Sequence, residues 1–133
     1  MDTSKEYIKM CEKAREIQEL WFRENGNFVF WKATNSIKII TDTFNTDDLK
    51  IFIWLPRQDQ LQDMVIEKWK KGIKEGNSYR GYPISFIEDF NQFIRCQIAQ
   101  KYNCVNWSME QLWLAFVMEN LYNKTWNGEG WIK

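Results

Sequence analysis

The chain has 133 residues, a length that suits one domain with its own hydrophobic core. Its 18 basic and 18 acidic residues give a formal net charge of zero, so no long-range field steers it toward nucleic acid or an anionic membrane. Histidine is absent, which removes the commonest general base and metal ligand. We predict one globular domain over residues 1–133 that holds no cofactor and no metal.

The first predicted element is an amphipathic helix over about residues 3–23. Apolar residues from Tyr7 to Trp21 recur at steps of three or four, with charges between them. Thr3 and Glu6 form a capping-box pair at its start. The pair Asn25-Gly26 ends it.

Three short β-prone segments follow the first helix, at residues 28–31, 37–41 and 51–54. Turn residues separate them, namely Asn35-Ser36 and the run from Asn45 to Asp48. Short connections favour antiparallel pairing, because parallel strands need a long crossover. We therefore predict a small antiparallel sheet in which the three strands form a meander.

Three further helices are expected in the second half of the chain. Pro56 precedes a helix of about residues 57–73, and a loop follows it over residues 75–83. The last two helices each begin with a capping box, formed by Ser85 with Glu88 and by Ser108 with Gln111. The fold class is thus α+β, with about four helices packed against a small antiparallel sheet.

The last of these helices is apolar on every side over residues 112–118. Such a helix is either the central element of a core or covered by another chain. We favour the central position, with a homodimer interface as the alternative. After it, Trp126 and Trp131 bracket a glycine-containing turn, which we expect to pack back over the domain; the alternative is an exposed indole that meets a partner.

Two polar surfaces are candidate binding sites. The first, at the start of the helix of residues 57–73, consists of Arg57, Gln58, Asp59 and Gln62. Its amide and carboxylate groups could recognise a partner, but we favour a solvated first turn with good capping, because amphipathic helices ordinarily show solvated polar faces. The second is a basic cluster near the end of that helix, with Lys68, Lys70, Lys71 and Lys74 around Trp69. Lysines there could hold phosphate, but they also complement the helix dipole, and Trp69 falls on the apolar face.

Carboxylates and thiols give weaker signals. A histidine-free enzyme acting on phosphate esters would need carboxylates that converge on a metal ion; the candidates are Asp42, Asp47, Asp48, Asp59, Asp63 and Glu88. The three cysteines, Cys11, Cys96 and Cys104, are widely spaced and include no C-x-x-C pair. We expect them to be reduced thiols in a cytoplasmic protein.

Residues 54–62 and 108–118 resemble stretches of a group of small uncharacterised proteins encoded by phages and prophages of low-GC Gram-positive bacteria. Residues 6–14 and 126–129 are similar to that group as well. The resemblance implies a phage-related setting in the cytoplasm and carries no activity. We expect a non-enzymatic binding or accessory protein that contacts another protein or its own copy. The alternatives are the metal-dependent enzyme and nucleic-acid binding through residues 68–74.

Overall fold

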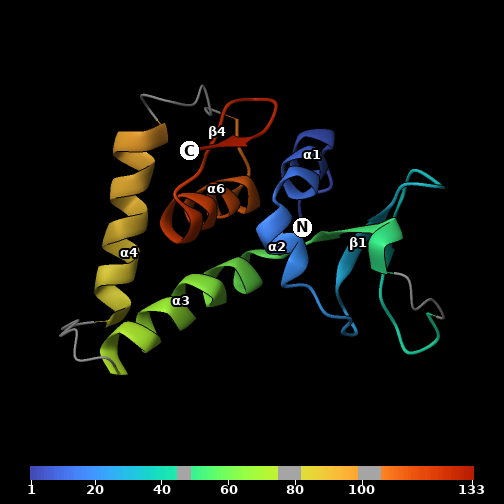
Figure 1. Ribbon diagram of the computed structural model, residues 1–133, viewed down its shortest axis with the longest axis horizontal. Helices are drawn as coiled ribbons and strands as arrows, with labels where there is room; N and C mark the ends of the chain where they lie inside the picture. The colour runs from blue at the N-terminus through green and yellow to red at the C-terminus, as the bar shows by residue number, and fades with distance from the viewer. Residues whose placement is uncertain (45–48, 75–81, 99–105) are drawn as a thin grey trace.

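A computed structural model places one helix, α6, in the middle of the molecule with the other elements around it (Figure 1). The structure describes residues 1–44, 49–74, 82–98 and 106–133. The helices are α1 (Lys5–Lys13), α2 (Arg15–Glu19), α3 (Gln58–Lys74), α4 (Tyr82–Phe93) and α6 (Met109–Tyr122), with the short turns η1 (Leu49–Ile51) and η2 (Ile94–Ile98). The strands are β1 (Phe28–Trp31), β2 (Ser36–Ile39), β3 (Phe52–Leu55), β4 (Thr125–Trp126) and β5 (Trp131–Ile132). The predicted α+β class is confirmed.

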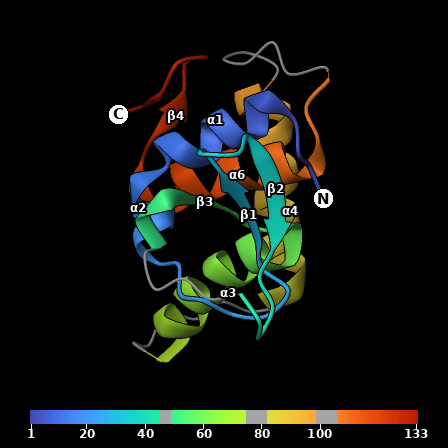
Figure 2. The ribbon, with the colours of Figure 1, turned by 90° about the vertical axis from the view of Figure 1, so that its right-hand side faces the viewer.

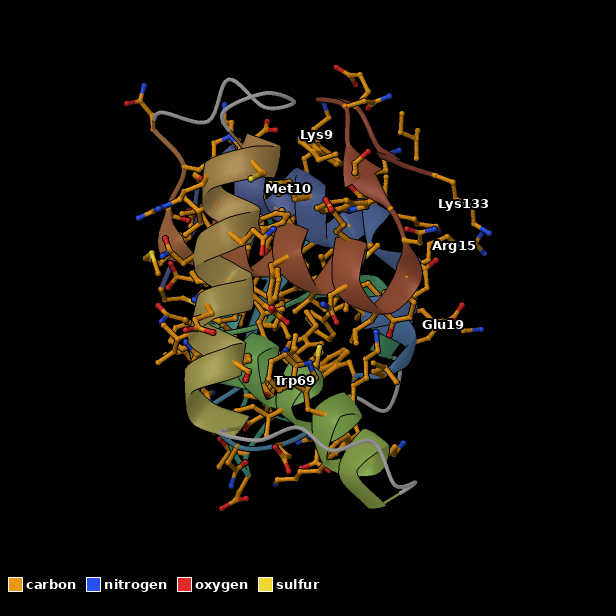
Figure 3. The ribbon with its side chains drawn as sticks, turned by 90° about the vertical axis from the view of Figure 1, so that its left-hand side faces the viewer. Lys9, Met10, Arg15, Glu19, Trp69 and Lys133 are labelled. Atoms are coloured by element: carbon orange, nitrogen blue, oxygen red, sulfur yellow. The ribbon has the colours of Figure 1, made fainter. Side chains whose placement is uncertain are left out.

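Helix α6 is the centre of the core. Its six consecutive side chains from Trp113 to Met118 are each at most 4% exposed. The predicted capping box is present, because Ser108 Oγ accepts from Gln111 N while the Gln111 side chain binds Ser108 N. Helices α1 and α3 both contact α6, and α4 crosses in front of it in Figure 3. The all-round apolar character is therefore satisfied within this chain.

Aromatic rings join α4, α6 and α3. Trp113 of α6 stacks on Phe90 with ring centroids 3.7 Å apart and on Phe86 at 5.2 Å. Phe86 in turn meets Trp69 of α3 edge-on at 5.8 Å. Figure 3 shows Trp69 where α3 approaches α4 and α6. These rings join the three helices in the interior.

The first helix is not continuous, and the prediction of one helix over residues 3–23 is wrong in this respect. Ala14 leaves the helical region at φ −83° and ψ 70°, so α1 ends before it and α2 begins after it. The predicted capping pair is also wrong: Ser4, not Thr3, caps α1, and its hydroxyl accepts from Tyr7 N at 3.2 Å.

The sheet contains the three predicted antiparallel strands, but its order is β2-β1-β3 and not that of a meander. Phe30 of β1 lies between Ile37 of β2 and Ile53 of β3. The connection over residues 40–51 is long enough to carry the chain across to the other side of β1. This order puts β3, whose four side chains are all buried, next to α1, while β2 lies at the outside.

The helix predicted over residues 57–73 is confirmed by α3. Helix α4 begins at Tyr82, so the capping box predicted at Ser85 is wrong and Ser85 lies inside the helix. Pro83 accounts for the earlier start, because proline fits a first helical turn. The predicted loop of residues 75–83 falls outside the described residues up to residue 81.

The C-terminal hairpin of β4 and β5 packs back on the domain, as predicted. The Trp126 and Trp131 rings lie 5.0 Å apart, and Trp126 is 4% exposed. Trp126 Nε1 donates to Glu6 Oε1 at 3.0 Å, and Trp131 Nε1 donates to the Met10 carbonyl at 2.9 Å. Among the helices that the structure describes, none has both the length and the apolar character that crossing a bilayer requires.

Candidate functional site

The polar surface predicted at the start of α3 holds the helix in place. Arg57 makes a two-pronged ion pair with Asp59 at 3.0 and 2.9 Å, and it also donates to the Gly26 carbonyl at 3.2 Å. The pKa of Asp59 is lowered by its hydrogen bond to Arg57. Gln58 and Gln62 are half-buried, and their side chains form no hydrogen bond within the described residues. The arrangement agrees with the structural interpretation of this surface.

The predicted basic cluster is largely engaged as well. Lys68 Nζ donates to the Asn120 carbonyl at 2.5 Å and so ties α3 to α6. Lys70 pairs with Glu67 at 2.8 Å, whereas Lys71 is exposed. The side chain of Lys74 lies outside the described part of the structure. Trp69 is 6% exposed and cannot stack on a base.

The candidate carboxylates do not gather in the described residues. Asp42 accepts from Asn25, Asp59 pairs with Arg57, and Asp63 and Glu88 are exposed. Asp47 and Asp48 lie outside the described residues. Over residues 1–44, 49–74, 82–98 and 106–133, no three acidic or cysteine side chains are close enough to hold a metal ion together.

Two of the thiols fall within the described chain. Cys11 is fully buried, and burial raises the pKa of its thiol, so it is an unreactive core residue. Cys96 is exposed in η2 and lines a pocket of about 220 Å³ between α4 and α6. Asp89 and Glu119 line the same pocket. Reactive thiols need electropositive surroundings, and this lining is acidic. Cys104 lies outside the described residues.

A larger pocket, of about 420 Å³, lies between α2 and β3. Trp21, Phe52 and Ile53 form its apolar part. Its charged lining consists of Glu12, Arg15, Glu19, Lys32 and Lys50, and Glu12 and Lys32 pair with each other at 2.5 Å. Figure 3 shows Arg15 and Glu19 at the rim of the molecule. Because the charged side chains around this pocket are of both signs, its lining favours neither anionic nor cationic ligands.

The outer edge of β3 beside this pocket is covered at Trp54 by a side chain. Gln18 of α2 accepts from Trp54 N at 2.9 Å and donates to Trp54 O at 3.0 Å. The amide thereby occupies both backbone groups that Trp54 directs away from the sheet. Native proteins cover strand edges in such ways because an open edge pairs with other chains.

The outer edge of β2, in contrast, has no partner strand in the described part of the chain. Ile40 N donates to Asn27 O at 2.9 Å, so Ile40 directs its backbone groups toward the β1 side. Successive residues of an antiparallel strand alternate in this respect, so Lys38 also faces β1, and Ile37 and Ile39 face outward. No backbone partner of Ile37 or Ile39 is found outside the β1 pairing within the described residues. Figure 2 views this side, where β1 and β2 lie in front of the helices.

The rest of the sheet gives the same alternation. Trp54 directs its backbone groups to Gln18, so its neighbour Val29 directs its own toward β2, where it pairs with Lys38. Ile39 is 50% exposed. The strand β2 thus lies at the outside of the sheet, and the backbone N–H and C=O groups of Ile37 and Ile39 point away from β1. We call these two residues the β2 edge.

The sequence predicted this strand but not its position at the outside of the sheet. The β-branched run around Lys38 indicates a strand, and a single lysine within it is typical of an edge. In a meander, however, the same segment would be the central strand with both edges paired. The strand order alone leaves this segment with an unpaired edge within the described residues.

No protein-family model, no curated protein and no solved structure matches the chain.

Proposed function

We propose that this protein is a non-enzymatic binding protein that acts through contact with another protein, and that the β2 edge is its docking site. The observation that carries the proposal is the contrast between the two sides of one sheet. Gln18 covers the β3 side at Trp54, whereas Ile37 and Ile39 leave the β2 side available for an added strand. The phage-related, cytoplasmic setting is part of the proposal and rests on the resemblance of residues 54–62 and 108–118.

The rigid interior supports this function. Adding a strand to a sheet gives affinity through backbone hydrogen bonds only if the template is already formed. Here β1 pairs with a strand on each side, and its Val29 side chain is fully buried in the aromatic-rich core. The backbone of Phe22, whose side chain is 65% exposed, is linked to the end of β2 through Asn27: Asn27 Nδ2 donates to the Phe22 carbonyl, and Ile40 N donates to Asn27 O.

A proline substitution tests the docking site without removing the strand. Ile39→Pro removes an N–H that points away from β1, and edge strands tolerate proline in that orientation. Ile39→Thr is the matched control, since it keeps the N–H and the β-branched side chain. Circular dichroism and urea unfolding establish that both variants fold.

The wild-type chain and both variants are then used as bait against extracts of phage-infected cells, and each retained protein is purified and titrated directly. A protein bound by the wild type and by Ile39→Thr, and at least tenfold more weakly by Ile39→Pro, supports the proposal. Amide hydrogen exchange in that complex is expected to show new protection at Ile37 and Ile39. Equal affinity for Ile39→Pro, or protection confined to other elements, contradicts it.

A further inference from the structure

The residue between the two outward isoleucines decides what kind of strand fits the β2 edge. An antiparallel partner that binds both Ile37 and Ile39 places one of its own residues directly opposite Lys38. That position is a non-hydrogen-bonded pair, in which the Cα atoms are only about 4.5 Å apart and the side chains are closest. The partner side chain opposite Lys38 therefore lies closest to the β2 edge, and its charge contributes to binding.

Lys38 is available for such a pair. Its side chain is half-buried on the sheet, opposite Val29 of β1. No salt bridge of Lys38 is present in the part of the chain that the structure describes. An acidic residue opposite Lys38 would give it a partner across the strands, whereas a basic residue would repel it.

The same lysine disfavours a second copy of this chain. A two-fold pairing of β2 with itself that uses both Ile37 and Ile39 puts Lys38 against Lys38, and like charges directly opposite destabilise a strand pair. Shifting the register of the two copies by one pair does not make this self-pairing more favourable. The next outward positions are Asn35, which has a left-handed φ of 51°, and Thr41, whose carbonyl accepts from Arg23 at 3.4 Å. Shifted copies therefore keep only one of the two isoleucine pairs.

The flanking positions are apolar. Ile37 and Ile39 lie on one face of the sheet with Phe30 and Phe28, their neighbours on β1. Partner residues opposite the two isoleucines would extend this apolar face. From this register, and resting on the proposed function of the β2 edge, we infer that the partner is an extended segment of a different protein with the pattern apolar–acidic–apolar, its acidic residue opposite Lys38.

Short synthetic peptides test the pattern directly. The probe is a blocked five-residue peptide, threonine-valine-glutamate-valine-threonine, titrated into the ¹⁵N-labelled full chain and followed by NMR. Two further peptides carry glutamine or lysine in place of the central glutamate. We expect saturable shifts at Ile37 and Ile39, with the glutamate peptide binding about 1.5- to 5-fold more tightly than the glutamine peptide and the lysine peptide binding weakest. The Lys38→Glu variant should reverse the order of the glutamate and lysine peptides.

The outcomes separate this inference from the proposed function. Peptides that bind the β2 edge equally well, whatever their central residue, overturn the inference and leave the docking site standing. A concentration-dependent dimer of the full chain that Ile39→Pro abolishes also overturns the inference, since the occupant is then a second copy. Absence of shifts at Ile37 and Ile39 with every peptide, together with a monomeric chain, overturns the inference and counts against the docking site as well.

Discussion

The side-chain amide of Gln18 binds the backbone of Trp54 as a neighbouring strand would. Its Oε1 accepts from Trp54 N, and its Nε2 donates to Trp54 O and, at 3.1 Å, to the Cys11 carbonyl at the end of α1. One amide therefore closes a strand edge and also joins two helices across the break at Ala14. With two hydrogen bonds to the backbone of Trp54 and one to that of Cys11, the Gln18 side chain holds α1, α2 and β3 together.

Gln18→Ala is expected to destabilise the chain. The substitution leaves the N–H and C=O of Trp54 without their partner, and an unsatisfied buried polar group costs about 1–3 kcal/mol. The free energy of unfolding from urea titration should fall by that amount. Gln62→Ala is the control, because Gln62 is half-buried on α3 and forms no hydrogen bond within the described residues; it should change stability by less than about 0.5 kcal/mol. Equal effects of the two substitutions would contradict the strand-like role of Gln18.

Much of the helical structure could be predicted because its signals are local. The capping box of Ser108 and the apolar run that follows it fix both the start and the burial of α6. The break at Ala14 has no local signal, since neither glycine nor proline is there. It accompanies a contact between Gln18 and Trp54, which are 36 residues apart in the chain. Periodicity cannot reveal such a contact.

The candidate site illustrates the same limit. Arg57 and Lys68 belong to polar clusters that stand out in the sequence. In the structure each donates a hydrogen bond to a distant backbone carbonyl, Arg57 to Gly26 and Lys68 to Asn120, so both side chains hold the fold together. The β2 edge, in contrast, is defined by backbone groups for which residues 1–44, 49–74, 82–98 and 106–133 supply no partner. Which strand lies at the outside depends on the order β2-β1-β3, and strand order is a property of the whole fold.

The ring stack of α4 and α6 should dominate the stability of the helical half. Trp113→Ala removes the ring that contacts both Phe90 and Phe86, and truncation of a buried tryptophan costs about 3–5 kcal/mol. The loss is measured as a lower urea midpoint by circular dichroism. Ile87→Ala serves as the control on α4: Ile87 is 65% exposed and should change stability by less than about 0.5 kcal/mol. A small loss for Trp113→Ala would show that the stack is dispensable.

The C-terminal hairpin should open locally when Trp131 loses its hydrogen bond. Trp131→Phe keeps an aromatic ring beside Trp126 but removes the donor to the Met10 carbonyl, at a cost of about 0.5–1.5 kcal/mol. We expect faster amide hydrogen exchange in β4 and β5, with unchanged exchange in α6. Ile132→Ala is the matched change on the same strand, where the side chain is 49% exposed, and it should leave the exchange rates as they are.

Acid should weaken the chain in part through Glu16. Burial by itself would raise the pKa of this carboxyl, but the hydrogen bond and charge of Lys124 outweigh it, and the pKa lies below its usual value of 4.5. A carboxyl with a lowered pKa in the folded chain stabilises it at neutral pH, and that contribution is lost as the pH falls below the usual value and through the folded-state pKa. Urea unfolding between about pH 7 and about pH 3 should show a decline in stability that is shallower in Glu16→Gln. Lys124→Met should flatten the decline in the same way, because it removes the cause of the shift. A pH dependence identical to the wild type in both variants would show that this pair contributes nothing to acid sensitivity.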